Sequence, residues 1–354
     1  MSAKPTGQPL RVGIIGDGFM QPSFFEKALR ERMPDREFDI RSMYLDWPLK
    51  LVSTKKDPVL PVIEFLGRPE DYYEFASDRE VLIVHLAPVI DETFEKAPDL
   101  RIVAVSRGGP VNIEVAAAKQ RGIPVINTPG RNASAVAEFT VGSLLAETRN
   151  MVRGHMSVKD GSFRRDFYHF DHAGPELCEL TVGIIGFGDI GARVARLLAP
   201  FGCRILVADP YKQLSADEQQ KLGISMVTLD ELLTQSDVVT LHPKVTPETK
   251  KMIGAEQIAK MKRGSYIVNT TRGQVLDYDA LYDALVSGQL RGAALDTFDP
   301  EPPPANAPLL QLPNVTLSPH IAGASIFSIT KAANMIAEDI ARILDGQPPL
   351  YPAK

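Results

Sequence analysis

The sequence is poor in cysteine, and its two cysteines exclude most roles that depend on several thiols. Cys178 and Cys203 are the only cysteines among 354 residues. Neither belongs to a CxxC motif or a Cys/His cluster, so a zinc site is not expected. Two thiols are enough for one disulfide. However, Cys203 lies in an α/β pattern of cytosolic type, which favours two buried, free thiols.

The sequence also lacks long apolar runs and an excess of basic residues. No stretch approaches the 18 uninterrupted apolar residues of a membrane span, and the N-terminal segment 1–11 lacks the apolar core of a signal peptide. A cytoplasmic location is therefore expected. The net charge of −5 does not favour a nucleic-acid binder, which usually carries a basic patch. What remains is a soluble globular protein, whose 354 residues predict two domains.

Apolar runs alternate with helical segments in the first part of the chain. Strands are predicted over 10–16, 81–87, 100–106 and 123–129, and helices over 24–33 and 111–122. Near-continuous apolar strands separated by helices are typical of a parallel sheet that is covered on both faces.

A second α/β pattern follows a long helix predicted over 133–153 and an aromatic, basic segment at 159–175, which is expected to form an irregular arm. Its strands are predicted over 181–186, 203–209, 224–229, 237–243, 265–271, 291–296 and 314–320. The proline-rich segment 301–308 must be a loop, because proline neither continues a helix nor donates to a sheet. The last helix, about 325–344, carries apolar residues at helical spacing, and we expect it to pack on the first domain.

The second of two glycine-rich turns has the features of a dinucleotide site. It reads GFGDIG over 186–191, follows the strand TVGII and opens a helix. Gly186 permits a tight turn, Gly188 lets the backbone approach a pyrophosphate, and Gly191 lets helix and strand pack closely. The next strand ends in Asp209, whose carboxylate can accept hydrogen bonds from both ribose hydroxyls. Because it would repel a 2′-phosphate, Asp209 favours NAD over NADP.

The first glycine-rich turn, GDGFMQ over 16–21, has Gln21 where the third glycine belongs. It could form a second nucleotide site, or it could simply be the first strand–helix turn of an α/β substrate domain. The missing glycine favours the second interpretation.

Three polar residues stand near the ends of predicted strands in the second half. Arg272 follows 265–271, Glu301 lies just beyond 291–296, and His320 ends 314–320. Each alone has an ordinary structural explanation as a surface or loop residue. Ligands of open α/β sheets bind beyond the carboxyl ends of the strands, where an arginine can hold a carboxylate. A histidine can transfer a proton there, and a carboxylate beside it would orient it and favour its charged form.

These residues lie in motifs that together resemble the D-isomer-specific 2-hydroxyacid dehydrogenase family. The family includes phosphoglycerate, lactate, glycerate and glyoxylate/hydroxypyruvate enzymes, and the resemblance covers about 81–345. The motifs are RGIPVINTPGRNASAVAEFT, ELTVGIIGFGDIGARVARLL, SDVVTLHPKVTPETKKMIG, SYIVNTTRGQVLDYDALYDAL, ALDTFDPEPP and LSPHIAG. Their common order and spacing are far more specific than one glycine-rich turn.

The resemblance implies the fold and the assembly. It implies an α/β protein of two doubly wound parallel-sheet domains, Rossmann-like and flavodoxin-like, with an active-site cleft between them. The substrate-binding domain would be discontinuous, over 1–128 and 324–354, and the NAD-binding domain would cover 129–323. The family fold also implies a homodimer, built largely from the helix near 133–153 and the arm that follows it.

The resemblance also implies the site, which would interconvert a small 2-keto acid and its D-2-hydroxy acid with NAD. Arg272 would bind the substrate carboxylate and carbonyl, and His320, paired with Glu301, would act as acid and base. Asp296 is expected near the nicotinamide amide. The implied cofactor contacts are Gly186, Gly188, Asp189, Ile190, Gly191, Asp209, His242, Pro243, Thr271, Asp296, His320 and Gly323. The implied substrate contacts are Ala87, Gly108, Gly109 and Arg272, and no metal is expected.

The chain departs from the family pattern in three places. The family's D-N-I-D is VNIE over 111–114, and its G-x-W in the arm is GSF over 161–163. His85 falls where phosphoglycerate enzymes carry a phosphate-binding arginine, so we expect that 3-phosphoglycerate is not the favoured substrate, although Arg107 or Arg131 could supply a cation. The chain ends at Lys354, so the C-terminal regulatory domain of some members is not expected.

Two alternatives use the same fold. Formate dehydrogenases resemble this chain but have a glutamine in place of the glutamate, so Glu301 argues against that chemistry. An NAD(H)-sensing corepressor would bind the cofactor as a signal, and the intact set of Arg272, Glu301 and His320 favours an enzyme instead. The sequence leaves open which 2-hydroxy acid is used and in which direction the reaction runs.

Overall fold

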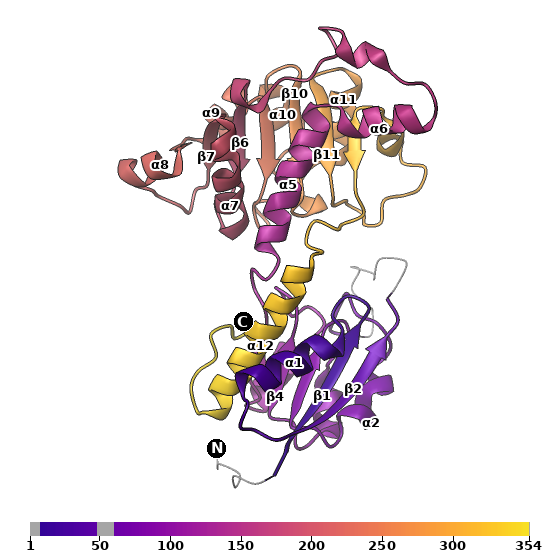
Figure 1. Ribbon diagram of the computed structural model, residues 1–354, viewed down its shortest axis with the longest axis vertical. Coiled ribbons are helices and arrows are strands. Elements are labelled where there is room, and N and C mark those ends of the chain that lie inside the picture. Colours follow the sequence, from indigo (N-terminus) through magenta and orange to yellow (C-terminus); the bar gives the residue numbers. More distant parts are fainter. Residues whose placement is uncertain (1–7, 48–59, 354) are drawn as a thin grey trace. The chain divides into compact units, whose positions relative to one another are not determined.

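A computed structural model describes residues 8–47 and 60–353, which form two compact units (Figure 1). The first unit comprises Met1–Arg131 and Ser325–Lys354, and the second comprises Asn132–Ala324. Part of the segment on which the signal-peptide prediction rests, residues 1–7, lies outside the described residues. No helix in the described part of the chain is long and apolar enough to cross a membrane.

The first unit contains a five-stranded parallel sheet with strand order β2-β1-β3-β4-β5. Its strands are β1 (Leu10–Asp17), β2 (Phe38–Leu45), β3 (Val81–Val84), β4 (Ile102–Val105) and β5 (Val125–Ile126). Every residue of β3 and β4 is buried, because helices cover both faces of the central strands.

The sequence analysis missed one strand of this sheet and predicted another too long. β2 was missed because it is an edge strand of exposed and half-buried residues, whereas the predicted strands were continuous apolar runs. The strand predicted over 123–129 is reduced to the two residues of β5.

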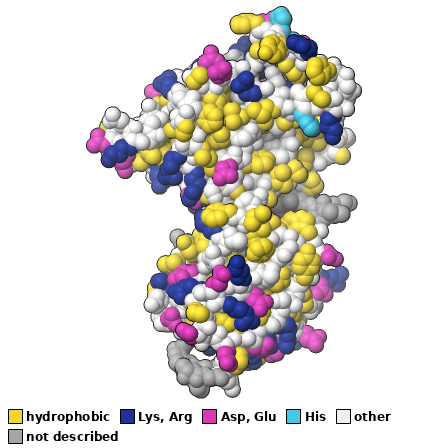
Figure 2. All heavy atoms as spheres, in the orientation of Figure 1, with side chains coloured by type: hydrophobic (Ala, Val, Ile, Leu, Met, Phe, Trp, Pro, Cys, Tyr) yellow, Lys and Arg dark blue, Asp and Glu magenta, His cyan; other side chains and the backbone are white. Residues whose placement is uncertain are grey.

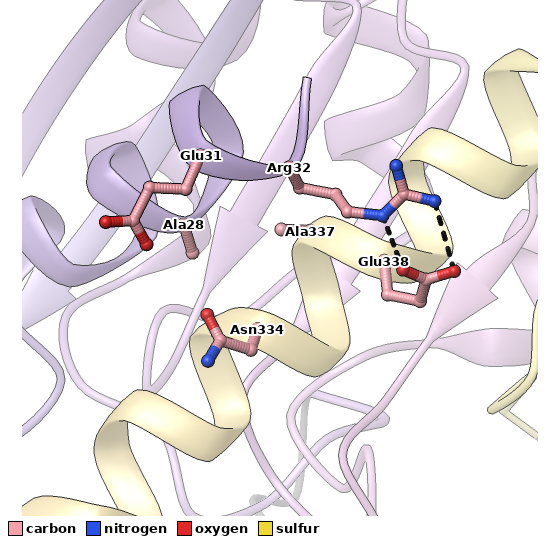
Figure 3. A pocket seen from close by; sticks show the side chains of 6 residues that line it. All are labelled: Ala28, Glu31, Arg32, Asn334, Ala337 and Glu338. Carbon is pink, nitrogen blue, oxygen red and sulfur yellow. Dashed lines mark hydrogen bonds and ion pairs between the residues drawn. The ribbon is translucent and has the colours of Figure 1, made fainter. Parts of the chain in front are cut away.

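Five helices accompany this sheet: α1 (Pro22–Arg32), α2 (Tyr73–Ala76), α3 (Asp91–Lys96), α4 (Val115–Gln120) and α12 (Ile326–Leu344). The C-terminal α12 lies against α1 and shares one hydrophobic core with α1, β1 and β3. Arg32 of α1 pairs with Glu338 of α12 at 2.5 Å beside a shallow groove between these helices (Figure 3). None of the predicted site residues lines this groove.

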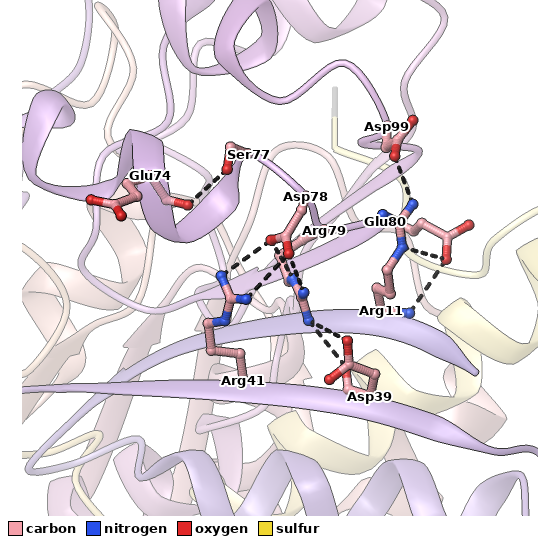
Figure 4. A network of polar contacts seen from close by, with 9 residues as sticks. All are labelled: Arg11, Asp39, Arg41, Glu74, Ser77, Asp78, Arg79, Glu80 and Asp99. Carbon is pink, nitrogen blue, oxygen red and sulfur yellow. Dashed lines mark hydrogen bonds and ion pairs between the residues drawn. The ribbon is translucent and has the colours of Figure 1, made fainter. Parts of the chain in front are cut away.

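Charged residues at the amino ends of the first sheet form a network (Figure 4). The side chain of Arg79 is only 2% exposed, and its guanidinium group donates to Asp78 at 2.6 Å and to Asp39 at 3.1 Å. Arg11, at the start of β1, bonds Glu80 and Asp99. Because these charges bond one another at the edge opposite the carboxyl ends, the network stabilises the fold and is not a ligand site.

The second unit contains a seven-stranded parallel sheet with strand order β12-β11-β10-β9-β6-β7-β8. Its strands are β6 (Thr181–Ile185), β7 (Arg204–Ala208), β8 (Ile224–Met226), β9 (Val238–Leu241), β10 (Ser265–Asn269), β11 (Leu290–Leu295) and β12 (Val315–Leu317). Its helices are α5 (Ala133–Thr148), α6 (Met151–Lys159), α7 (Asp189–Leu198), α8 (Ala216–Leu222), α9 (Leu229–Gln235), α10 (Ala255–Lys260) and α11 (Tyr278–Val286). The prediction of two doubly wound parallel sheets is confirmed.

The single helix predicted over 133–153 is wrong, because the chain turns between α5 and α6. Asn150 adopts a left-handed conformation with φ of 54°, which asparagine tolerates better than most residues. The backbone of Gly174, near the end of the arm, packs so closely on Thr148 that a Cβ there would lie 1.9 Å from the Thr148 carbonyl oxygen. Within the arm, the short 3₁₀ helix Arg165–Tyr168 has no buried residue, as expected for an irregular segment.

Both cysteines are free, but only one is buried. Cys203 precedes β7 in the core of the second unit, whereas Cys178 is exposed. The prediction of two buried thiols was therefore wrong for Cys178. It lies in the 3₁₀ turn Leu177–Glu179, in which Leu177 takes the buried position.

Each sheet has one point where the strand order reverses, between β1 and β3 in the first and between β6 and β9 in the second. Neighbouring connections leave such a point toward opposite faces of the sheet, and the crevice at its carboxyl edge is where ligands of doubly wound sheets bind. The predicted glycine-rich turns follow β1 and β6, so each turn stands at such a point.

Candidate active site

The turn after β6 combines two glycines that the fold requires with one that it does not. Gly186 has φ of +89°, and a Cβ there would lie 2.8 Å from the His242 carbonyl carbon. A Cβ on Gly191 would lie 2.1 Å from the Gly186 oxygen. Around Gly188, by contrast, no described atom beyond its chain neighbours lies within 4 Å of such a Cβ. The open space at Gly188 therefore lets a ligand approach the backbone at the start of α7.

Asp209, directly after β7, fixes the same turn from the side. Its Oδ2 accepts the Phe187 N–H at 2.7 Å and its Oδ1 accepts the Tyr211 N–H at 2.9 Å. Asp189, the first residue of α7, is paired with Arg193 one turn later, at 2.9 Å. The turn thus carries a fixed carboxylate at the place where a ribose is held in dinucleotide sites.

On the β9 side of the turn, a buried nitrogen has no hydrogen-bond partner. His242 Nε2 lies 3.0 Å from Thr240 Oγ1, whereas Nδ1 is buried and bonds no described residue. Burial lowers the pKa of His242 to about 3, so the ring is neutral near neutral pH. Next to it, Thr271 donates its hydroxyl to the Pro243 carbonyl at 3.1 Å, which joins the loops after β9 and β10.

The loop after β10 holds Arg272 by its backbone and leaves the guanidinium group exposed. Buried Asn269 accepts the Thr271 N–H at 3.1 Å and donates to the Arg272 carbonyl at 3.0 Å. The guanidinium group contacts only the Thr271 carbonyl within the described residues, at 2.8 Å. A Cβ on Gly273 would lie 2.0 Å from the Phe298 carbonyl, so this glycine allows the arginine loop to lie against the loop after β11.

His320 and Glu301 form a hydrogen-bonded pair. His320 Nδ1 lies 2.6 Å from Glu301 Oε1. The glutamate side chain is 11% exposed and that of the histidine 33%, and His320 Nε2 bonds no described residue. The backbone of His320 has φ of 56°, a strained conformation for a non-glycine residue that is more frequent at functional sites.

Asp296 holds the loop that carries His320. Its Oδ1 accepts the Ser318 hydroxyl at 2.6 Å and the Ile321 N–H at 2.9 Å, and its Oδ2 accepts the Ala322 N–H at 2.8 Å. The side chain is fully buried. The sequence analysis placed Asp296 near the cofactor and missed this supporting role, which a buried acid at the end of an apolar strand could have indicated. Its contact with the nicotinamide amide stays a prediction.

Two of the predicted cofactor residues, Ile190 and Gly323, contribute to packing within the second unit. Ile190 is partly buried and packs against the core of the second unit. A Cβ on Gly323 would lie 2.4 Å from the amide nitrogen of the Asn132 side chain, so a larger residue there would displace that side chain inside the second unit.

In the first unit, the predicted substrate contacts lie at the carboxyl ends of β3 and β4. Ala87, after β3, is buried, and its carbonyl accepts the Asn112 side chain at 2.8 Å. A Cβ on Gly108 or Gly109 would meet no described atom closer than 3.9 Å. Packing therefore does not require glycine at these two positions, and a ligand that approaches the backbone would explain them.

Within the second unit, the structure joins residues that the sequence separates by up to 48 positions. The arginine loop and the loop before Glu301 touch through Gly273 and Phe298, and Glu301 bonds His320. The open glycine, the fixed acid and the unpartnered buried nitrogen of His242 all fit a dinucleotide. The arrangement can hold a carboxylate and move a proton beside it.

Comparisons with known proteins agree with this chemistry. Residues 141–322 match the model of the D-isomer specific 2-hydroxyacid dehydrogenase NAD binding domain. A glyoxylate reductase of Korarchaeum cryptofilum is 42% identical over 78% of this chain and 83% of its own. A hydroxypyruvate reductase of Thermotoga maritima is 38% identical over 75% and 85%. The crystal structure of a D-lactate dehydrogenase from Treponema pallidum has a TM-score of 0.79 and 27% identity, over 98% of this chain and all of the other.

Proposed function

The chain belongs to the D-isomer specific 2-hydroxyacid dehydrogenase family, and on that premise we propose which of its residues carry the reaction and which substrates it takes. It is an NAD-dependent oxidoreductase that interconverts 2-keto acids and D-2-hydroxy acids. The observation that carries the assignment of residues is the His320–Glu301 bond, which engages Nδ1, while Nε2 bonds no described residue.

The residues around the second glycine-rich turn bind the cofactor. When bound, NAD(H) supplies or accepts the hydride at the substrate's C2 atom. Gly188 and the amino end of α7 hold the pyrophosphate, and the Asp209 carboxylate accepts hydrogen bonds from the ribose hydroxyls. Thr271, His242 and Pro243 line the same crevice. An unmodified ribose is favoured, because Asp209 repels a 2′-phosphate.

Arg272 and His320 act on the substrate. The planar guanidinium group of Arg272, free of any carboxylate partner in the described structure, holds the substrate carboxylate and polarises the carbonyl at C2. His320 donates the proton from Nε2 to the developing alkoxide and takes it back in the oxidation direction. Glu301 orients the ring through Nδ1.

Small 2-keto acids are the substrates that we propose, as the names of the relatives suggest. Glyoxylate and hydroxypyruvate are the first candidates, because two of the relatives are named as reductases of these acids. Gly108 and Gly109, whose positions need no glycine for packing, present their backbone to the substrate.

We also propose a cytoplasmic homodimer. Large hydrophobic side chains of α6 and the arm are exposed, including Met151, Met156, Val158, Phe163 and Phe170, which are 53–91% exposed. Figure 2 shows hydrophobic side chains gathered on the face of the second unit that carries α5. Exposed apolar surface of this extent is typical of a protein–protein interface.

An assay with the purified chain tests the proposed reaction. We expect oxidation of NADH with glyoxylate, hydroxypyruvate or pyruvate, weaker oxidation of NADPH, and a product of D configuration. Tight binding of NADH without turnover of any 2-keto acid would instead support the NAD(H)-sensing alternative. Light scattering would test the dimer, and a monomer at micromolar concentration would exclude it.

A further inference from the structure

Tyr278, the first residue of α11, has no part in the proposed reaction, although it lies between two loops that the reaction uses. Its side chain packs against the core of the second unit. The hydroxyl donates to the Thr297 carbonyl, and the ring centre lies 6.3 Å from that of Phe298, at an angle of 40°. Tyr278 therefore contacts the loop after β11, which leads to Glu301.

The same hydroxyl meets the side chain that holds the arginine loop. The Asn269 side chain hydrogen-bonds the Tyr278 hydroxyl, and the amide is the donor because the O–H is already given to Thr297. Asn269 also donates to the Arg272 carbonyl at 3.0 Å and accepts the Thr271 N–H at 3.1 Å. This fully buried amide thus bonds two groups of the arginine loop and the tyrosine.

The start of α11 is fixed, so Tyr278 is anchored independently of the two loops. Asp277 caps the helix by accepting the Asp279 N–H at 3.1 Å, and Lys251 pairs with the Asp277 carboxylate at 3.1 Å. The Asp277 N–H donates to the Ile253 carbonyl at 2.9 Å. The tyrosine therefore stands at a fixed point of the second unit.

Tyr278 also keeps its proton over the pH range in which most enzymes act. Burial raises the pKa of Tyr278, and nearby Glu301 and Asp299 raise it further, against the effect of the hydrogen bond from Asn269. A neutral hydroxyl donates and accepts at the same time, as its bonds to Thr297 and Asn269 require. The tyrosine is therefore a link between loops and not a second acid.

Arg272 depends on such a link, because little else holds its side chain. The guanidinium group is exposed and bonds only the Thr271 carbonyl within the described residues. Its place is thus set by the backbone of the arginine loop. A displacement of about 1 Å in a group that positions a substrate can cost on the order of 10²-fold in rate.

We propose that Tyr278 is a positioning residue that acts through Asn269 to hold the backbone of Arg272 against the loop that leads to Glu301. The proposal rests on the proposed function. Gly273 lets the two loops touch at Phe298, and the tyrosine joins them by hydrogen bonds. All of these groups belong to the second unit.

Three variants test the link. Tyr278→Phe removes only the hydroxyl. Tyr282→Phe is the matched control, because Tyr282 lies one turn later in α11, packs against the same core, and its hydroxyl bonds no described residue. Asn269→Ser breaks the link on its other side. The values of kcat and KM are measured with glyoxylate, hydroxypyruvate and pyruvate and expressed per NADH-binding site, so that a less stable variant remains informative.

The loss should concern the keto acid and not the cofactor. We expect Tyr278→Phe to lower kcat/KM roughly 10-fold for each 2-keto acid that the wild type reduces, as for one hydrogen bond, and to leave the Kd for NADH unchanged. Asn269→Ser should lose at least as much, and Tyr282→Phe should behave as the wild type.

A double-mutant cycle separates positioning of Arg272 from general support of the fold. Tyr278→Phe is also made in Arg272→Lys, whose side chain lacks the planar fork. Because the tyrosine acts through the arginine, the two losses should be less than additive. A tyrosine that only stabilised the fold would lower kcat/KM by the same factor in both backgrounds.

Four results would overturn the proposal. They are an unchanged kcat/KM in Tyr278→Phe, an equal loss in Tyr282→Phe, a parallel loss of NADH affinity, and the same factor in the Arg272→Lys background. The proposed function survives each of them as long as the wild type reduces a 2-keto acid. A wild type that reduces none would refute the proposed function and this role with it.

Discussion

The two units each contain a histidine bonded to a carboxylate at the carboxyl edge of a parallel sheet, and the two pairs differ in almost everything else. The Nδ1–oxygen distances are nearly the same, 2.5 Å for His85–Asp17 and 2.6 Å for His320–Glu301. The His85 side chain is 6% exposed and that of His320 is 33%. Asp17 is also bonded to two backbone N–H groups of its own turn, whereas His320 stands in a strained conformation with Nε2 open.

This difference shows that a histidine–carboxylate contact does not by itself define an acid–base group. In the first unit the contact satisfies two buried polar groups and closes the turn, which is a structural role. In the second unit the same contact orients a ring whose other nitrogen bonds no described residue, and we propose that this nitrogen meets the substrate. The glycine-rich turns differ in the same way, since Asp17 fills the first turn and Gly188 leaves the second open.

Replacement of each histidine should give the largest contrast. We expect His320→Ala to lower turnover by roughly 10²–10⁴-fold, the range for loss of a general acid–base group, while NADH binding is largely kept. His85→Ala should mainly lower the free energy of unfolding, by about 1–3 kcal/mol, because buried Asp17 loses a hydrogen-bond partner. Steady-state kinetics, NADH titration and denaturant unfolding measure these effects. Unchanged turnover in His320→Ala would remove this residue from the mechanism.

The glycines of the two turns should respond in opposite ways to an added methyl group. Gly188→Ala meets open space, so we expect an unchanged melting temperature without cofactor but a Kd for NADH raised on the order of 10-fold or more, since the pyrophosphate can no longer approach. In Gly16→Ala the new Cβ would lie 2.3 Å from the Met20 oxygen. This overpacking should lower stability by about 1–3 kcal/mol. Tight NADH binding by Gly188→Ala would contradict the assignment of the turn.

Replacement of Asp209, the acid beside the second turn, should separate cofactor choice from folding. Asp209→Ala should reduce the preference for NADH over NADPH by roughly 10-fold, because the repulsion of the 2′-phosphate is lost. Asp209→Asn is the matched control, since it can keep one of the bonds to the Phe187 and Tyr211 N–H groups. A wild type that already prefers NADPH would refute the role of this carboxylate.

The smallest effect is expected at the opposite edge of the first sheet, away from both turns. The hydrogen bond from Arg79 lowers the pKa of Asp78 to about 2. The stabilisation is therefore complete above the ordinary pKa of an aspartate and is lost as the pH falls through about 2. Asp78→Asn should cost about 0.5–1 kcal/mol at neutral pH, the range for partly exposed pairs, and less in acid. The free energies of unfolding of the wild type and of Asp78→Asn, measured with denaturant between neutral and acid pH, test this. A difference between them that grows on acidification would contradict the expected sign.

Much of the fold was predictable, because buried strands of parallel sheets are continuous apolar runs. The runs VLIV and IVAV became β3 and β4, and GFGDIG became the turn before α7. The edge strand β2 was missed because its half-exposed pattern has no such run. The helix predicted over 133–153 failed at Asn150, because a single residue in a left-handed conformation leaves little trace in the periodicity of its neighbours.

The residues of the proposed site could be picked out from the sequence, but their contacts could not. Arg272, Glu301 and His320 stood out because each polar residue interrupts an apolar pattern near a strand end. Two features could not be read from the sequence as contacts: the φ of His320 and the three hydrogen bonds that Asp296 accepts from the loop that carries His320. Each depends on atoms that are brought close only by folding.

The sequence by itself determined the layered α/β class, the position of the second glycine-rich turn and the identity of the side chains proposed to react, because hydrophobic periodicity, glycine spacing and residue chemistry are local properties of the chain. Only the tertiary structure decided which of two similar histidine–carboxylate pairs is open and which is closed. Burial and hydrogen-bond partners depend on residues that only folding brings together. In this protein they distinguish a structural pair from the pair proposed to transfer the proton.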